Sequence, residues 1–177
     1  MKIFTAGYEG TTIDAFFYTL LLYGVQKIID VREIPISRKK GFSKNAFKLE
    51  AEKRHIEYFH LKQLGCPKEI RHAYREHRDW QRYLQDFIPY LKTQKEELIH
   101  LLEVAKQDTI CLVCFEADAN FCHRLCVVEA VNELSNYRFE IIHLDPVSTI
   151  DIAWQMLLAD KSHQQSTIDL GIYTYFP

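Results

Sequence analysis

The sequence lacks an apolar run long enough to cross a membrane. Its longest apolar stretch, Ala15 to Val25, is too short to span a bilayer and shows helical periodicity. Met1 to Ala6 has the pattern of a strand, and no small-residue cleavage site follows an apolar core, so no signal peptide is expected. We therefore expect a cytoplasmic protein without a membrane partner.

A surplus of positive charge is also missing. The formal net charge is −2, which gives no global signature of nucleic-acid binding, so any such argument must rest on local clusters. The five cysteines are an odd number in a chain of 177 residues, which argues against a secreted disulfide scaffold and fits reduced thiols. Internal repeats, low-complexity tracts and linkers are absent, so we expect a single domain over residues 1–177.

Short apolar strands alternate with helical patterns along the chain. A strand, a helix and a strand within the first thirty or so residues form a βαβ unit, which requires a parallel sheet. The sequence predicts a three-layer α/β domain around a mostly parallel five-stranded sheet, with helices on both faces. A helical insertion is expected at about residues 67–107 and a C-terminal extension at about 147–177. The expected strands are 2–6, 25–31, 56–59, 109–115 and 139–144.

The expected helices include one long helix from Lys68 to about Ile88, which Pro89 kinks or ends. Thr93 and Glu96 form a capping box for the helix after it. A short final helix, residues 150–158, and an aromatic tail, Tyr173 to Phe176, complete the chain. The other expected helices are 13–23, 43–54, 94–105 and 121–134.

Residues with charged, titratable or nucleophilic side chains follow each expected strand. In an open parallel sheet the carboxyl ends of the strands share one edge, where ligands bind. The sequence therefore predicts a site built from Tyr8 and Glu9, Asp30 and Arg32, His60, Cys114 and Glu116, and His143 and Asp145.

The stretch from Thr109 to Cys126 is the centre of that prediction. Glu116 ends a buried strand and is expected to act as a general base or to orient Arg124. If Asn120 caps the next helix, Cys122 lies in its first turn, where the helix dipole favours a thiolate. Cys122 or Cys114 would then be a nucleophile.

Plainer interpretations stay open for these groups. Cys122 and Cys126, four residues apart, can pack inward, and packing is favoured for Cys114. Proton transfer is assigned to Glu116 with His60 or Glu9, although a structural role for His60 is equally open. The candidate catalytic residues are Glu116, Cys122, Cys114, His60 and Glu9.

Cysteine and histidine are zinc ligands, and they are frequent in this stretch. The spacing argues against a metal, however, because a strand splays Cys111 and Cys114 apart and the adjacent Cys122 and His123 point to different helix faces. A structural zinc is therefore disfavoured, and neither a metal nor another cofactor is expected.

A basic loop from Arg32 to Lys44 suits a phosphate group. It combines cationic side chains with Gly41 for a tight turn, and Ser43 opens a helix. A solvated charged loop and an Asp30–Arg32 ion pair are the alternatives. The predicted anion-binding residues are Arg32, Arg38, Lys44 and Arg124, with Tyr8, Asp30 and His123 lining the site.

A second basic feature lies on the expected long helix. Its spacing puts Arg71, Arg75, Arg78 and Arg82 on one stripe, which could follow a nucleic-acid backbone. Acidic residues interleave with this stripe, so a salt-bridged solvent face is the favoured interpretation.

Several short blocks occur together along the chain: Gly7-Tyr8-Glu9-Gly10, Asp30-Val31-Arg32, Pro35, Ser37-Arg38, Gly41-Phe42-Ser43-Lys44, His60, Leu64-Gly65, Cys114-Phe115-Glu116 and Cys122-His123-Arg124. In this order and spacing they resemble the domain-of-unknown-function family 488 over roughly residues 1–145. The resemblance implies a cytoplasmic α/β protein of similar size and leaves the activity open. The stretch from about Pro146 falls outside it.

The leading functional hypothesis is an enzyme that acts on a phosphorylated small molecule, a nucleotide or a nucleic-acid end. Its anion-binding site would lie at the carboxyl edge of the sheet. The alternative is a non-catalytic nucleic-acid-binding module that uses the basic loop and the arginine stripe. A metal-stabilised structural protein is a third hypothesis. The sequence does not distinguish a monomer from a homodimer.

Overall fold

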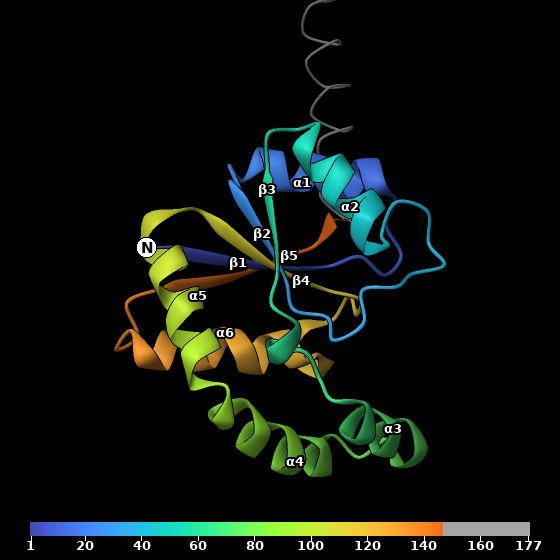
Figure 1. Ribbon diagram of the computed structural model, residues 1–177, viewed down its shortest axis with the longest axis vertical. Coiled ribbons are helices and arrows are strands. Elements are labelled where there is room, and N and C mark those ends of the chain that lie inside the picture. The colour runs from blue at the N-terminus through green and yellow to red at the C-terminus, as the bar shows by residue number, and fades with distance from the viewer. Residues whose placement is uncertain (147–177) are drawn as a thin grey trace, which may run out of the picture.

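The computed structural model describes residues 1–146 of the chain (Figure 1). The expected helix at 150–158 and the aromatic tail at 173–176 lie outside the described residues. Every helix within residues 1–146 is too short or too polar to cross a membrane.

Five parallel strands form one sheet in the order β3-β2-β4-β1-β5. The central strand β4 is buried along its whole length. Its register places Val113 beside Asp30 and Cys114 beside Gly7, so three strands end level with one another. The residues that follow them therefore leave the sheet side by side. The strands are β1 (Lys2–Gly7), β2 (Lys27–Asp30), β3 (Glu57–His60), β4 (Ile110–Cys114) and β5 (Glu140–Leu144).

Helices cover both faces of this sheet, which confirms the predicted three-layer α/β fold (Figure 1). Helices α1 (Ile13–Leu22) and α2 (Lys44–Glu52) lie on one face. Helices α5 (Lys95–Gln107) and α6 (His123–Leu134) lie on the other, with α3 (Lys68–His77) and α4 (Trp80–Thr93) beyond them.

Strand alternation divides the core between the two faces. Cys111 and Val113 of β4 pack into the aromatic cluster under α1 and α2, whereas Ile110 and Leu112 pack toward α5 and α6. The next residue of the alternation, Cys114, reaches His123 at the start of α6. Cys111 and Cys114 therefore lie on opposite faces, as predicted.

The prediction of one helix from Lys68 to Ile88 is wrong. Arg78 ends α3 in the left-handed conformation, with φ of 53°, and Asp79 begins α4 by accepting a hydrogen bond from the backbone N–H of Arg82 at 3.0 Å. Pro89 lies inside α4, which continues to Thr93 because Phe87 and Leu91, on either side of the proline, are anchored in the core.

The predicted capping box before α5 is also absent. Gln94 precedes α5 and makes no side-chain cap. The Thr93 hydroxyl donates instead to the carbonyl of Tyr90, one turn back in α4, at 2.7 Å. Only Gln94 separates α4 from α5, so Thr93 still belongs to α4 and its hydroxyl bonds to the last turn of that helix.

Candidate functional site

The loop after β4 turns tightly over the end of β1. A side-chain Cβ at Gly7 would lie 1.8 Å from the carbonyl oxygen of Glu116, so this close approach requires glycine. The Arg124 guanidinium donates to the carbonyls of Glu116 and Ala117, and the Glu9 carboxylate accepts from the backbone N–H of Ala117 at 3.1 Å. Contacts with Gly7, Arg124 and Glu9 therefore fix the backbone at Glu116 and Ala117.

Cys122 lies just before α6 rather than in its first turn. A short 3₁₀ turn, Ala119–Phe121, starts at Asp118, whose carboxylate accepts from the backbone N–H of Asn120 at 2.9 Å. Cys122 is then extended, with φ of −131° and ψ of 137°, and forms the N-cap of α6. Asn120 therefore does not cap α6, so the condition for placing Cys122 in the first turn is not met. The premise that Cys122 and His123 diverge as helical neighbours is wrong.

Four side chains meet at this point, and we call them the Cys–Glu–His cluster: Cys114, Glu116, Cys122 and His123. Their donor atoms all lie within 4.8 Å of one another. Glu116 Oε2 accepts from Cys114 Sγ at 3.1 Å and from Cys122 Sγ at 3.2 Å. His123 Nδ1 is 3.6 Å from Cys114 Sγ, and its Nε2 is 2.8 Å from the carbonyl oxygen of Val31.

The cluster is largely buried. Cys114, Cys122 and His123 are 3%, 1% and 8% exposed, whereas Glu116 is partly exposed. Glu116 is therefore the most exposed residue of the cluster, and attack by either sulfur would require the loop over β1 to open.

Burial and mutual charge shift the pKa values of this cluster in different directions. Burial, with the neighbouring Cys122 and Glu116, raises the pKa of Cys114 well above its usual range. Burial also opposes ionisation of Cys122, but its interactions with Cys114 and His123 and the charge of Arg124 hold the pKa of Cys122 well below its usual range.

The other two groups shift upward. Burial and the charge on Cys122 raise the pKa of Glu116. Burial would lower the pKa of His123, but its interactions with Cys122 and Glu116 raise it. The arrangement thus favours a negative sulfur at Cys122 beside a positive imidazole.

Arg124 is fully buried next to the cluster. Besides the two loop carbonyls, its Nε donates to the Thr5 hydroxyl at 3.4 Å, and Thr5 Oγ1 lies 2.7 Å from His143 Nδ1. Burial and the Arg124 charge lower the pKa of His143. These partners of Arg124 are uncharged, so it holds the loop in place and adds positive charge to the cluster. The sequence-based prediction placed it against a bound anion instead.

Asp30, Arg32 and Tyr8 form a separate buried network on the opposite face of the sheet, under α2. Asp30 Oδ1 accepts from Arg32 Nε at 2.8 Å, and Oδ2 accepts from Arg32 Nη2 and from the Tyr58 hydroxyl, both at 2.6 Å. Arg32 Nη1 donates to the Tyr8 hydroxyl at 2.9 Å and to the Phe42 carbonyl at 2.8 Å. Arg32 therefore forms the ion pair with Asp30 that the sequence offered as an alternative. The hydrogen bonds of its guanidinium go to Asp30, Tyr8 and Phe42.

This network also shifts pKa values. Burial alone would lower the pKa of Arg32, but hydrogen bonding to the Asp30 carboxylate raises it further above its usual value. Burial and the Asp30 charge raise the pKa of Tyr58. Tyr58 was missed by sequence reasoning, although it lies two residues before His60 on the same face of a strand.

A groove of about 540 Å³ lies beside the start of α2, and we call it the Lys44 groove. Lys44 Nζ is 2.9 Å from His60 Nδ1, and His60 Nε2 is 2.8 Å from the carbonyl oxygen of Arg32. Since His123 bonds to the preceding carbonyl, that of Val31, one backbone segment joins the groove to the cluster. The groove lining includes Pro35, Ser43, Lys44, Asn45, His60 and Lys62.

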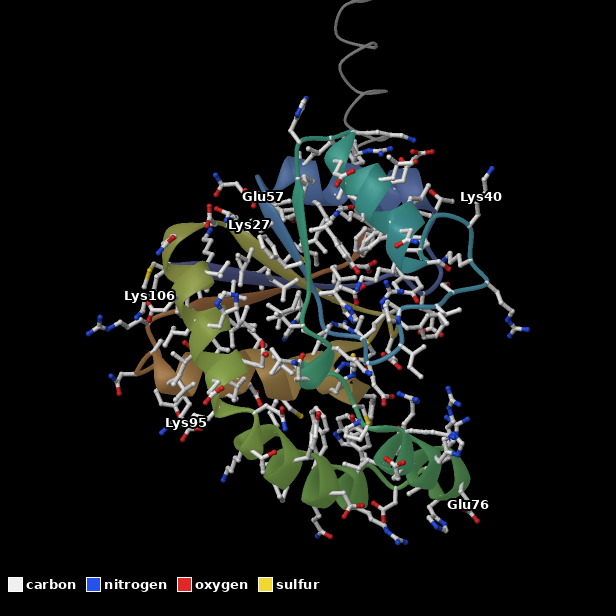
Figure 2. All side chains as sticks on the ribbon, in the orientation of Figure 1. Lys27, Lys40, Glu57, Glu76, Lys95 and Lys106 are labelled. Carbon is white, nitrogen blue, oxygen red and sulfur yellow. The ribbon has the colours of Figure 1, made fainter. Side chains whose placement is uncertain are left out.

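The basic loop beside this groove has a fixed shape. Ser43 is the N-cap residue of α2, as predicted, but its side chain makes no capping bond. Ser43 Oγ donates instead to the Ser37 carbonyl at 2.9 Å and accepts from the Ser37 N–H at 3.0 Å. Lys39 Nζ donates to the Tyr8 carbonyl at 2.7 Å, and its partial burial lowers its pKa. Arg38 and Lys40 are exposed, and Figure 2 shows Lys40 projecting from the loop.

The predicted arginine stripe is interrupted. Arg78 is the left-handed residue at the end of α3, so Arg71 and Arg82 belong to different helices. Arg71 Nη1 donates to the Glu33 carboxylate at 2.6 Å and to the Cys66 carbonyl at 2.9 Å. The stripe therefore does not form one continuous surface.

Comparison with known proteins identifies one related family. A family model described as "Domain of unknown function DUF488" matches residues 12–131, which is more than half of the chain, and confirms the resemblance seen in the motifs. The match includes both the Cys–Glu–His cluster and the Lys44 groove. Neither the curated proteins nor the solved structures contain a match.

Proposed function

The chain belongs to the DUF488 family, whose description names no activity, and we propose that it is an enzyme acting on a phosphorylated small molecule, a nucleotide or a nucleic-acid end. One observation carries the proposal. Two thiols, a carboxylate and an imidazole converge at the carboxyl edge of a parallel sheet, where open α/β folds bind ligands. Interacting titratable groups with strongly shifted pKa values are typical of catalytic centres.

Glu116 is the group that we assign to proton transfer. It is the most exposed member of the cluster, and its backbone is fixed by Arg124 and by the close packing on Gly7. A carboxylate held in a fixed position can exchange a proton with a bound substrate or water. The two sulfurs are almost fully buried, so we assign them a supporting role rather than nucleophilic attack.

The Lys44 groove supports the phosphate part of the proposal. Lys44 and Lys62 supply positive charge, and the first turn of α2 has no side-chain cap for its backbone N–H groups. The Glu33 carboxylate in the same groove is paired with Arg71, which offsets its negative charge. We therefore place the phosphate at Lys44 and the reacting part of the substrate near Glu116. The nucleic-acid-binding module is not carried forward, because its arginine stripe is interrupted.

Lys44→Ala is expected to raise KM for the phosphorylated substrate about 10–100-fold with little change in kcat. A hydrogen bond to a charged group contributes roughly 1.5–3 kcal/mol, and Glu116 is not among the residues that line the groove. The substrate would first be found by incubating the full chain with nucleotides, sugar phosphates and end-phosphorylated oligonucleotides. Mass spectrometry of the products reports turnover.

Lys48→Ala is the matched control. Lys48 lies one turn further along α2, is exposed and pairs with Glu52 at 3.6 Å, so its removal should leave KM unchanged. Equal effects of the two substitutions would contradict the placement of the phosphate. The absence of turnover across the whole set of substrates, by zinc-loaded and zinc-free protein alike, would contradict the proposed function.

A further inference from the structure

We propose that Cys114, Cys122 and His123 bind one Zn²⁺ ion, with Glu116 at the fourth, solvent-facing position. Two sulfurs, one imidazole nitrogen and one carboxylate oxygen are ligands that zinc prefers, and thiolates favour it over the harder cations magnesium and calcium. Within residues 1–146, this is the one place where three or more such side chains bring their donor atoms together. The inference rests on the proposed function only for the role of Glu116.

The distances in the cluster are close to those of a tetrahedral zinc site. Zinc lies about 2.0–2.3 Å from its ligands, which keeps the ligand atoms roughly 3.3–3.8 Å apart. Glu116 Oε2 lies 3.1 Å and 3.2 Å from the two sulfurs, and His123 Nδ1 lies 3.6 Å from Cys114 Sγ. All four donor atoms lie within 4.8 Å of one another, so side-chain shifts of up to about an ångström would bring them around one ion.

His123 is oriented as a zinc ligand would be. Its Nε2 lies 2.8 Å from the carbonyl oxygen of Val31 and donates to it. Nδ1 is the ring nitrogen nearer to Cys114 Sγ, at 3.6 Å against 3.9 Å for Nε2, and on metal binding it would lose its proton and offer its lone pair to the ion. Histidine ligands of metals usually donate their second ring nitrogen to a carbonyl or a carboxylate in this way.

The local charge also fits a bound dication. Two thiolates and a carboxylate carry three negative charges, and burying them together without a cation is costly. Zn²⁺ would neutralise two of these charges. The fully buried Arg124, whose partners are carbonyls and a hydroxyl, would balance the third.

The differences in exposure define the kind of zinc site. Structural zinc sites close all four positions with protein ligands, whereas catalytic sites use three and keep the fourth exchangeable. Here three donors are buried and Glu116 is partly exposed. We therefore infer that Glu116 is the exchangeable ligand, which leaves its carboxylate beside whatever replaces it on the ion.

The test measures metal in the full chain, produced without a polyhistidine tag in zinc-supplemented medium. Mass spectrometry of the purified protein should find about one zinc per wild-type chain. Cys122→Ser should retain less than about a tenth of that amount, because a thiolate ligand is lost. The control Cys126→Ser changes a buried cysteine one turn along α6, outside the cluster, and should keep the full amount.

Two further measurements distinguish the loss of a zinc ligand from the loss of the fold. Glu116→Gln keeps the three buried donors and should bind zinc roughly 10–100-fold more weakly than the wild type. Cobalt-substituted wild-type protein should show the near-ultraviolet charge-transfer absorption of thiolate ligands. Circular dichroism reports the fold of each variant.

The outcomes separate this inference from the proposed function. Reduced wild-type protein that carries no zinc and takes up neither Zn²⁺ nor Co²⁺ would overturn the metal site, and so would equal zinc loss in Cys122→Ser and Cys126→Ser. Bound zinc without turnover of any phosphorylated substrate would support the metal site and refute the proposed function. Turnover by protein that takes up neither Zn²⁺ nor Co²⁺ would support the proposed function and refute the metal site.

Discussion

Glu116→Gln should lower kcat by about 10²–10⁴-fold, the usual contribution of a general acid or base, with a much smaller change in KM. Glutamine has nearly the shape of glutamate but cannot take up a proton at this position. Arg124 holds the backbone carbonyl of residue 116 rather than its carboxylate, so the loop should keep its conformation in the variant. Steady-state kinetics on the substrate found by the screen give both constants.

Glu96→Gln is the control for this experiment. Glu96 is an exposed residue in the first turn of α5, outside the cluster and the groove, and the same chemical change there should leave kcat unchanged. A Glu116→Gln variant that keeps wild-type kcat would show that Glu116 moves no proton in the rate-limiting step.

Gly7→Ala should lower the free energy of unfolding by at least about 3 kcal/mol, at the upper end of the usual cost of overpacking. The added methyl group would lie 1.8 Å from the Glu116 carbonyl oxygen and 2.9 Å from Ala117 Cα. These are backbone atoms held by Arg124 and Glu9, so they cannot move aside as a flexible side chain would. Urea denaturation followed by circular dichroism measures the change.

Gly24→Ala separates this clash from the general cost of replacing glycine. Gly24 has φ of +66°, and nothing lies within 4 Å of an added Cβ. Its substitution should cost only the strain of a left-handed alanine, about 1–2 kcal/mol. If Gly7→Ala proves no more destabilising than Gly24→Ala, the tight packing of the Glu116 loop on β1 is not a feature of the protein in solution.

Hydrophobic pattern and strand alternation were sufficient to predict the fold. The apolar run Ile110–Cys114 identified the central strand, and its alternation correctly separated Cys111 from Cys114. The βαβ unit required a parallel sheet, and in such a sheet the carboxyl ends of the strands lie together. The sequence could therefore locate the edge at which the candidate site lies.

The assignment of roles at that edge depended on contacts that the sequence does not contain. Asp30 and Cys114 both end strands but face opposite sides of the sheet, so the predicted single site is a buried ion-pair network on one face and the Cys–Glu–His cluster on the other. Arg32 and Arg124 have the charge expected of anion ligands, yet both are buried and bonded within the chain.

The cluster itself depended on where one helix begins. The sequence offered Asn120 as a plausible cap, but a short 3₁₀ turn moves the start of α6 to His123. That shift of a few residues allows Cys122 and His123 to converge. The bond that orients His123 joins it to Val31, a distant residue in the sequence, and no local pattern predicts it.

Alkylation of each cysteine, measured by mass spectrometry before and after chelation, tests most directly whether the cluster is one zinc-binding centre. All five cysteines are free and buried, so each should react slowly in the untreated protein. Removal of the metal would leave buried negative charges uncompensated and should loosen the loop over β1, so Cys114 and Cys122 should then react faster, while Cys66, Cys111 and Cys126 keep their rates. Unchanged rates for Cys114 and Cys122, or rapid reaction of Cys122 before chelation, would contradict the account.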